Sequence, residues 1–232
     1  MLTILSEGEP RNVVSPDLYA ETFSAAVNYL TLQDFIDPER IGALGICGSG
    51  SFVISAARID SRIKAVATSS MYDMGAVNRN GLWKAQSVEQ RKAAIVSATQ
   101  QRSIEAAGGE VQYTCTSSRQ TRPISNASST TFTVRRAAST CPPGSMRDLT
   151  THPTLSSVAR FMNFYPFNDI DTISPRPMQF VSGDQAHSRE FSEDAYAGAA
   201  EPKELYCDLY DRVDLIPFAK FAEFAVNNTA TQ

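Results

Sequence analysis

The sequence predicts an α/β fold, with a mostly parallel sheet flanked by helices. Short apolar runs at Ile41–Ile46 and Met178–Val181 have the length and composition of buried strands. Between the first of these runs and a further short strand, Arg62–Thr68, the segment Gly50–Arg58 reads as a helix. A strand, a helix and a strand in this order form parallel neighbours joined by a right-handed crossover.

The composition is that of an ordinary globular chain. Its 232 residues suit one domain, 42% of them are hydrophobic, and the formal net charge is −4. The chain lacks the excess of basic residues that is typical of nucleic-acid-binding proteins. No apolar run approaches the roughly 18 residues that suggest a membrane span. We therefore expect neither a nucleic acid nor a membrane as a partner.

The N-terminus and the cysteines indicate the compartment. Met1–Leu5 is too short for the apolar part of a signal peptide, and a polar segment follows it at once. The cysteines show no C-x-x-C spacing and no accompanying histidine pair, which favours free thiols over a zinc site or a disulfide framework. They are Cys47, Cys115, Cys141 and Cys207. We expect a cytoplasmic protein in a reducing environment.

A helix is expected near the N-terminus, after a short stretch, Leu2–Leu5, that can be the end of a strand. Ser15 can cap this helix, and Pro16 suits its first position because proline lacks the N–H that would be unpaired there. Apolar residues then recur at helical spacing as far as Leu30. The segment Asp37–Arg40 breaks the pattern before the first central strand.

The middle of the chain is expected to hold a lid or insertion over residues 74–160. Within it, Ser87–Ala107 reads as a long polar helix, which is either part of a cap or a plain connecting helix. From Val111 to Arg147, Ser, Thr and Arg dominate and no Asp or Glu occurs. Such a segment buries too little apolar surface to offset its ordering entropy, so residues 111–147 are predicted to be disordered.

The C-terminal part predicts the remaining elements of the sheet and its covering helices. In chain order they are an apolar helical segment at Leu155–Phe167, the strand Met178–Val181, a helix at Phe191–Ala200, a weakly alternating strand at Leu205–Tyr210 and an amphipathic helix at Val213–Val226.

The chemistry of the sequence centres on Cys47. The glycines of Gly45–Gly50 allow a tight strand-to-helix turn, because glycine tolerates positive φ and close backbone approach. Such a nucleophile elbow exposes its central side chain above the sheet, and the next N–H, here that of Gly48, helps to form an oxyanion hole. The start of a helix favours the thiolate, a strong nucleophile. The common form of the turn has glycine where this chain has Ser49, and a buried structural cysteine is the alternative.

Several collinear segments carry a resemblance to a known family. They are Ser6–Arg11, Ala26–Leu30, Asp37–Cys47, Asp60–Asp73, Met162–Phe167, Ile173–Pro177, Gly183–Tyr196 and Glu201–Tyr206. These segments resemble the middle and the tail of dienelactone-hydrolase-like α/β hydrolases. The resemblance implies a partial α/β-hydrolase fold in a single truncated domain over residues 1–232, with the first strands missing.

The resemblance also implies roles for individual residues. Cys47 would be the nucleophile, and Gly48 would contribute one oxyanion donor. Asp184, after the strand Met178–Val181, would orient a histidine, with Asp194 as the alternative acid. His187 is a weak candidate for the base, because the matching stretch in similar sequences is a loop feature. This mechanism needs only side chains and water, so no metal and no cofactor are expected.

One departure from that family bears on activity. Its members carry the catalytic histidine after the strand at Leu205–Tyr206, where this chain has Cys207, and the two histidines of the chain are His152 and His187. We expect hydrolysis of a small-molecule ester, thioester or lactone through an acyl-Cys47 intermediate, with impaired activity. The alternatives are a non-catalytic remnant that binds a partner, or itself, through an exposed sheet edge, and a thiol-reactive binder without turnover.

Overall fold

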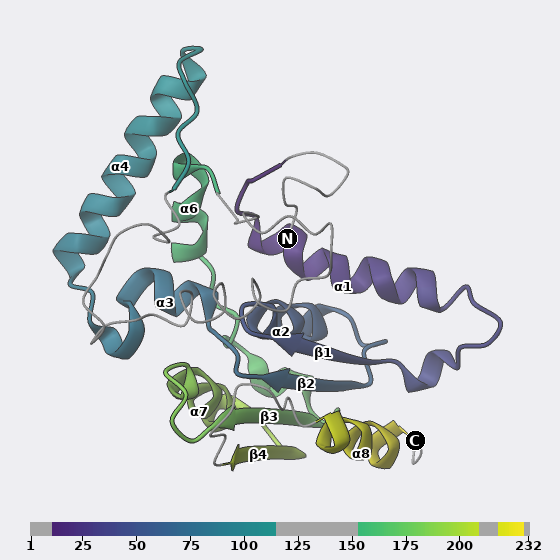
Figure 1. The fold of residues 1–232 in the computed structure, drawn as a ribbon. Coiled ribbons are helices and arrows are strands. Elements are labelled where there is room, and N and C mark those ends of the chain that lie inside the picture. Colours follow the sequence, from purple (N-terminus) through teal and green to yellow (C-terminus); the bar gives the residue numbers. More distant parts are fainter. Residues whose placement is uncertain (1–10, 115–152, 209–217, 230–232) are drawn as a thin grey trace, which may run out of the picture. The chain divides into compact units, whose positions relative to one another are not determined.

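The structure contains a four-stranded parallel sheet with helices packed beside it (Figure 1). The computed structural model describes residues 11–114, 153–208 and 218–229. The strands are β1 (Gly42–Ile46), β2 (Ala65–Ser69), β3 (Met178–Gly183) and β4 (Lys203–Asp208), in the order β1-β2-β3-β4. All three neighbouring pairs are parallel, which confirms the fold class expected from the sequence.

Helices connect and cover the strands. They are α1 (Pro16–Leu30), α2 (Ser49–Ile59), α3 (Met74–Asn80), α4 (Val88–Ala106), α6 (Leu155–Met162), α7 (Arg189–Gly198) and α8 (Phe218–Thr229), with short 3₁₀ turns η1 (Pro38–Arg40), η2 (Leu82–Lys84) and η4 (Ile170–Ile173). None of the described helices combines the length and apolar character that a membrane-spanning helix requires.

The chain divides into two compact units, whose boundaries fall within α4 and α6. The larger unit comprises Ser15–Val96 and Ala159–Gln232 and holds the sheet; the smaller comprises Met1–Val14 and Ser97–Val158. In the smaller unit, Tyr113 and Thr154 form an antiparallel bridge, and the Ser157 hydroxyl accepts a hydrogen bond from Val14 N–H at 3.0 Å. The predicted insertion at 74–160 overlaps both units and stays a prediction.

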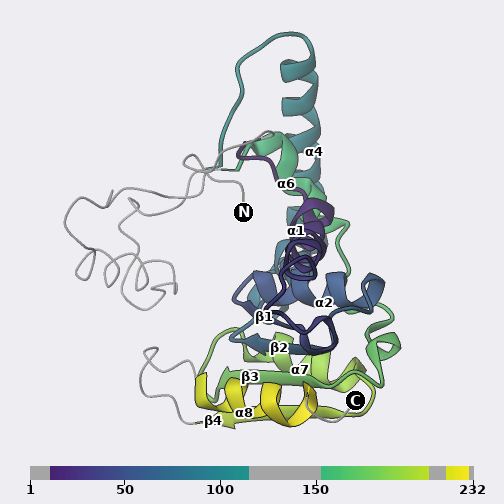
Figure 2. The same cartoon turned by 90° about the vertical axis from the view of Figure 1, so that its right-hand side faces the viewer.

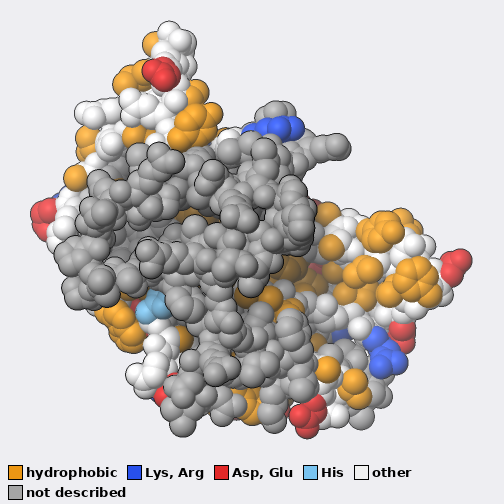
Figure 3. Space-filling model, in the orientation of Figure 1, with side chains coloured by type: hydrophobic (Ala, Val, Ile, Leu, Met, Phe, Trp, Pro, Cys, Tyr) orange, Lys and Arg blue, Asp and Glu red, His pale blue; other side chains and the backbone are white. Residues whose placement is uncertain are grey.

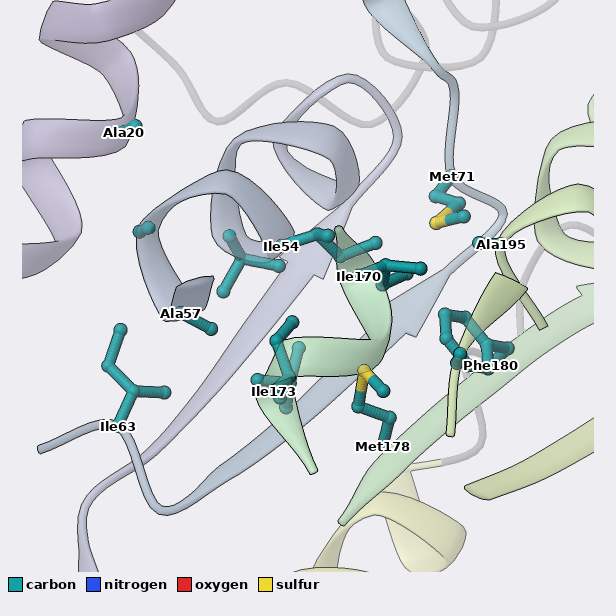
Figure 4. Packing of buried hydrophobic residues seen from close by; sticks show 14 of the residues in the cluster. Ala20, Ile54, Ala57, Ile63, Met71, Ile170, Ile173, Met178, Phe180 and Ala195 are labelled. Carbon is teal, nitrogen blue, oxygen red and sulfur yellow. The ribbon is translucent and has the colours of Figure 1, made fainter. Parts of the chain in front are cut away.

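Apolar side chains cover both faces of the sheet. On one face, Met178 and Phe180 of β3 pack with Ile54 of α2, Ile173 of η4 and Ala195 of α7 (Figure 4). The opposite face packs against α8 through Phe221 and Phe224, and Figure 2 shows α8 against the strands. Every residue of β2 and β3 is buried. Burial on both faces explains why neither strand shows the regular apolar–polar alternation of a half-exposed strand, and polar residues such as Thr68 and Gln179 are buried within them.

Arg176 joins the end of α2 to the segment that enters β3. Its guanidinium donates a hydrogen bond to the nearby Ile173 O at 3.2 Å and to three carbonyls that are distant in the chain, those of Ala57 at 2.6 Å, Asp60 at 3.0 Å and Ile63 at 3.0 Å. The carbonyls at the end of a helix have no partner within the helix, and a donor with several N–H groups satisfies them together. These hydrogen bonds fix the position of the segment that enters β3 relative to the end of α2.

The structure departs from the sequence predictions at several places. Helix α3 was not predicted; it begins after Asp73, whose carboxylate accepts a hydrogen bond from Ala76 N–H at 2.7 Å. The segment predicted at Leu155–Phe167 is helical only to Met162, because Pro166 disfavours a longer helix. The weakly alternating strand β4 is fully paired with β3. The strand expected at residues 2–5, most of the loop expected at 111–147 and His152 lie outside the described residues.

Candidate active site

Cys47 occupies a strained turn between β1 and α2. Its φ is +57°, in the left-handed region that non-glycine residues rarely adopt, and its side chain is exposed. The backbone holds this conformation from both sides: Cys47 N–H donates to Ser69 O at 3.0 Å, and Cys47 O accepts from Gly50 N–H and Tyr72 N–H, each at 3.1 Å. Such strain persists only where the surrounding structure fixes it, and it is typical of a nucleophile elbow.

Two side-chain requirements explain why Gly45–Gly50, here called the elbow, folds in this way. A Cβ on Gly45 would lie 2.6 Å from both Gly50 Cα and Ser49 O, so only glycine fits there. The Ser49 hydroxyl donates to Ile46 O and accepts from Ile46 N–H, each at 2.7 Å. Serine at this position therefore closes the elbow by hydrogen bonding, and the departure from the common glycine pattern is compatible with the turn.

Gly48 directly follows the nucleophile candidate and is the N-cap residue of α2. Among the residues that the structure describes, its N–H donates no hydrogen bond, and it stands at the helix end that attracts negative charge. A Cβ on Gly48 would lie 3.0 Å from the Met74 sulfur, so Met74 lies close to this N–H. The position suits an oxyanion donor, the role expected for Gly48 from the sequence.

The segment after β3 carries the other two predicted site residues. The Asp184 carboxylate accepts a hydrogen bond from Gln185 Nε2 at 3.0 Å, and Asp184 O accepts one from Arg189 Nη1 at 3.2 Å. His187 Nε2 is hydrogen-bonded to the Tyr72 hydroxyl, and burial lowers the pKa of His187. Within the described part of the chain, Asp184 and His187 make no hydrogen bond with each other. Asp194 is exposed on α7.

Tyr72 and Asp73 are site residues that the sequence analysis did not identify. The Tyr72 ring lies 5.6 Å from the rings of both His187 and Phe191. Asp73 is buried, and this burial raises the pKa of its carboxyl group, although the hydrogen bond from Ala76 N–H opposes the shift. The signal that could have found them is their position, because both residues directly follow the end of β2.

These residues gather at one edge of the sheet. Ile46 of β1 pairs with Ser69 of β2, and Ser69 pairs with Val181 of β3, so the carboxyl ends of the three strands are level. Cys47, Tyr72 and His187 follow these ends. Open α/β sheets bind their ligands outside the carboxyl ends of the strands. The structure therefore brings the cysteine and the histidine predicted from the sequence to the same edge.

The described residues hold no cluster of three or more His, Cys, Asp or Glu side chains that could bind a metal ion. Cys47 and Cys207 are free thiols, as the sequence analysis expected, and Cys115 and Cys141 lie outside the described residues. The groups that the structure places at this edge include an exposed thiol, backbone N–H groups, a phenol, an imidazole and the carboxyl groups of Asp73 and Asp184.

Known proteins resemble this chain over most of its length. No protein-family model matches it. The chain is 40% identical over 233 residues to the uncharacterized protein PA2218 of Pseudomonas aeruginosa, an alignment that takes in 94% of this chain and 61% of that protein. The crystal structure of the hypothetical protein PA2218 matches with a TM-score of 0.83 and 38% identity, covering 96% of this chain and 71% of that one.

Two further likenesses come from fungi. The α/β hydrolase GrgF from Penicillium sp. sh18 matches with a TM-score of 0.75, covering 97% of this chain and 76% of that one. At 18% identity this likeness concerns the fold alone. A stretch of 61 residues is 43% identical to the thiohydrolase aneE of Aspergillus aculeatus, and it takes in 26% of this chain and 19% of that protein.

Proposed function

Because this chain belongs to the family of PA2218 and has an α/β-hydrolase fold, we propose that it hydrolyses a small-molecule ester, thioester or lactone with Cys47 as its nucleophile. The observation that carries this proposal is the exposed cysteine with a φ of +57° in the elbow. We place the chain beside the dienelactone-hydrolase-like members of that fold. The two exposed free thiols suit a reducing compartment, and we propose the cytoplasm.

The proposed reaction has two steps. The Cys47 thiolate attacks the acyl carbonyl carbon, and the electron pair of the carbonyl moves to oxygen, near Gly48 N–H and the start of α2. Collapse of this intermediate expels an alcohol or a thiol, which takes up a proton, and leaves a thioester on Cys47. Water then attacks that thioester, releases the carboxylic acid and restores the thiol.

The surroundings of His187 favour slow turnover. A catalytic triad needs a base that is hydrogen-bonded to the nucleophile and oriented by a carboxylate. In the described residues, His187 Nε2 is engaged by Tyr72 and the Asp184 carboxylate by Gln185. General-base catalysis contributes about 10²–10⁴-fold to a rate. We therefore propose that the acyl-Cys47 intermediate forms and then hydrolyses slowly.

Pre-steady-state kinetics with p-nitrophenyl acetate test this proposal. We expect a burst of about one p-nitrophenolate per chain, followed by a slow steady rate, because acylation would precede a slower hydrolysis. The matched control is Cys207→Ala, which removes the other described free thiol and should keep the burst. The proposal fails if the Cys47→Ala variant shows the same burst as the unaltered chain.

A second candidate function is association between copies of this chain. Hydrophobic side chains gather at the surface over α1 (Figure 3), and Tyr29, Leu32 and Phe35 are 65%, 79% and 82% exposed. This segment precedes β1, an edge strand of the described sheet. Exposed apolar patches and unpaired strand edges are common interaction sites.

Light scattering tests this second function. We expect the unaltered chain to be a dimer, and the double variant Leu32→Ser, Phe35→Ser to be a monomer. A monomeric unaltered chain would exclude this function.

A further inference from the structure

Tyr72 connects the elbow to the segment after β3. Its backbone N–H donates to Cys47 O at 3.1 Å, so the backbone of Tyr72 is fixed beside the nucleophile candidate. Its side-chain hydroxyl is hydrogen-bonded to His187 Nε2. One residue therefore contacts both Cys47 and the histidine at the carboxyl edge of the sheet.

Packing holds the Tyr72 ring in place. The rings of His187 and Phe191 each lie 5.6 Å from it, at interplanar angles of 56° and 36°. Phe191 is 3% exposed, so this contact belongs to the rigid part of α7. Offset and tilted aromatic pairs at this distance are favourable. The phenol is thus restricted in orientation before any substrate arrives.

The segment that carries His187 is also well anchored. Ala186 N–H donates to Gly183 O at 3.1 Å, Arg189 N–H donates to Ala186 O at 3.0 Å, and Ser188 is 2% exposed. The position of the imidazole is therefore set by the end of β3 and the start of α7. This anchoring makes His187 suited to hold a partner side chain.

The protonation state of His187 determines whether its ring can donate or accept the hydrogen bond with the Tyr72 hydroxyl. Burial lowers the pKa of His187, so the neutral imidazole predominates at neutral pH. In the tautomer that carries the proton on Nε2, the ring donates to the phenol oxygen. The phenol hydrogen can then donate to a further acceptor, and that hydrogen bond is strengthened by the first.

We propose that the Tyr72 hydroxyl donates a hydrogen bond to the carbonyl oxygen of the acyl group at Cys47, and that His187 is the positioning residue for this hydroxyl. This inference rests on the proposed acyl chemistry at Cys47. Tyr72 would act together with Gly48 N–H, since tyrosine hydroxyls and backbone N–H groups both serve as oxyanion donors. The histidine after β3 then supports substrate binding instead of removing the proton from the thiol.

The test compares two reactions of the same thiol. Acylation by p-nitrophenyl acetate builds negative charge on the carbonyl oxygen, whereas alkylation by iodoacetamide displaces iodide at carbon and forms no oxyanion. Loss of one oxyanion donor costs about 10²–10³-fold in rate. We expect Tyr72→Phe to slow acylation of Cys47 by about 10²-fold and to leave alkylation within about twofold. The matched control is Tyr29→Phe, at an exposed tyrosine on α1.

Variants of His187 separate positioning from general folding. We expect His187→Ala to slow acylation, and His187→Gln to restore part of the rate, because the amide can still donate to the phenol oxygen. Neither substitution should alter alkylation. Thermal unfolding of each variant checks that the fold is retained, and Tyr72→Phe keeps the ring contacts with His187 and Phe191.

The outcomes distinguish failure of the role proposed for Tyr72 from failure of the proposed function. Equal acylation rates for the unaltered chain and Tyr72→Phe would overturn the role of Tyr72 and leave the proposed function standing. An equal loss of acylation and alkylation in Tyr72→Phe would also overturn it, because the phenol would then act on the thiol. If iodoacetamide modifies Cys47 but the ester never acylates it, the proposed function fails and the substrate role of Tyr72 fails with it.

Discussion

The loop after β1 and the loop after β3 differ in how their functional residues are fixed. In the elbow, local contacts form much of the geometry, since Ser49 bonds to Ile46 and Gly45 packs directly on Gly50, while the Cys47 backbone also pairs with Ser69 and Tyr72. After β3, His187 is held by a contact with Tyr72, which lies 115 residues away in the chain. The turn that carries the nucleophile candidate can thus be recognised in a short sequence, whereas the contact between Tyr72 and His187 depends on the completed sheet.

The largest expected effect is at the elbow itself. Gly45→Ala places a Cβ 2.6 Å from two backbone atoms, which cannot move aside as a side chain can. Overpacking of this kind typically costs about 1–3 kcal/mol, and because backbone atoms are involved we expect a loss at the upper end of that range, about 3 kcal/mol, in the free energy of unfolding. Chemical denaturation measures it. Gly42→Ala on the same strand, where the nearest contact is 3.5 Å, is the matched control and should cost far less.

The next effect concerns the contact between the end of α2 and the segment that enters β3. Arg176→Ala removes the hydrogen bonds to Ala57 O, Asp60 O and Ile63 O. Hydrogen bonds to charged groups contribute about 1.5–3 kcal/mol, and three carbonyls lose a partner, so we expect a loss of about 3 kcal/mol in the free energy of unfolding. Arg176→Lys should recover only part of it, because lysine cannot span three carbonyls. A denaturation midpoint unchanged by Arg176→Ala would show that this contact does not stabilise the fold.

A smaller effect tests whether the elbow depends on its serine. Ser49→Ala removes the hydroxyl that pairs with both backbone groups of Ile46. Such a hydrogen bond contributes about 1 kcal/mol to stability. We expect a loss of about that size and a changed rate of Cys47 alkylation by iodoacetamide. An unaltered alkylation rate would mean that the glycines alone set the turn.

The smallest effect is a pH dependence of the free energy of unfolding that arises from His187, in the loop after β3. Burial lowers the pKa of His187 in the folded chain, so the unfolded chain binds more protons below the ordinary histidine pKa of about 6.5. The free energy of unfolding should therefore fall as the pH drops from about 7 through the pKa of the folded chain. His187→Gln should reduce this slope. Parallel slopes in both chains would place the titration at another group whose pKa is lower in the folded chain than in the unfolded chain.

The sequence predicts the elbow and the parallel sheet because both depend on local signals. The doubly buried strands β2 and β3 contain short apolar runs, and the glycines around Cys47 mark the turn. Helix α3 escaped prediction because its start depends on the single cap at Asp73. The pairing of Tyr72 with His187 escaped because no local pattern joins residues from loops on different strands. The sequence of β4 alternates only weakly, so it gives a weak strand signal. In the fold, pairing with β3 along its whole length determines that it is a strand.

The central claim is that Cys47 forms an acyl intermediate. Intact mass spectrometry after brief treatment with p-nitrophenyl acetate, followed by peptide mapping, tests it most directly. We predict one acetyl group per chain, located on the peptide that contains Cys47 and absent in Cys47→Ala. Acetylation that is spread over Cys207 and the lysines, with Cys47 unmodified, would contradict the claim.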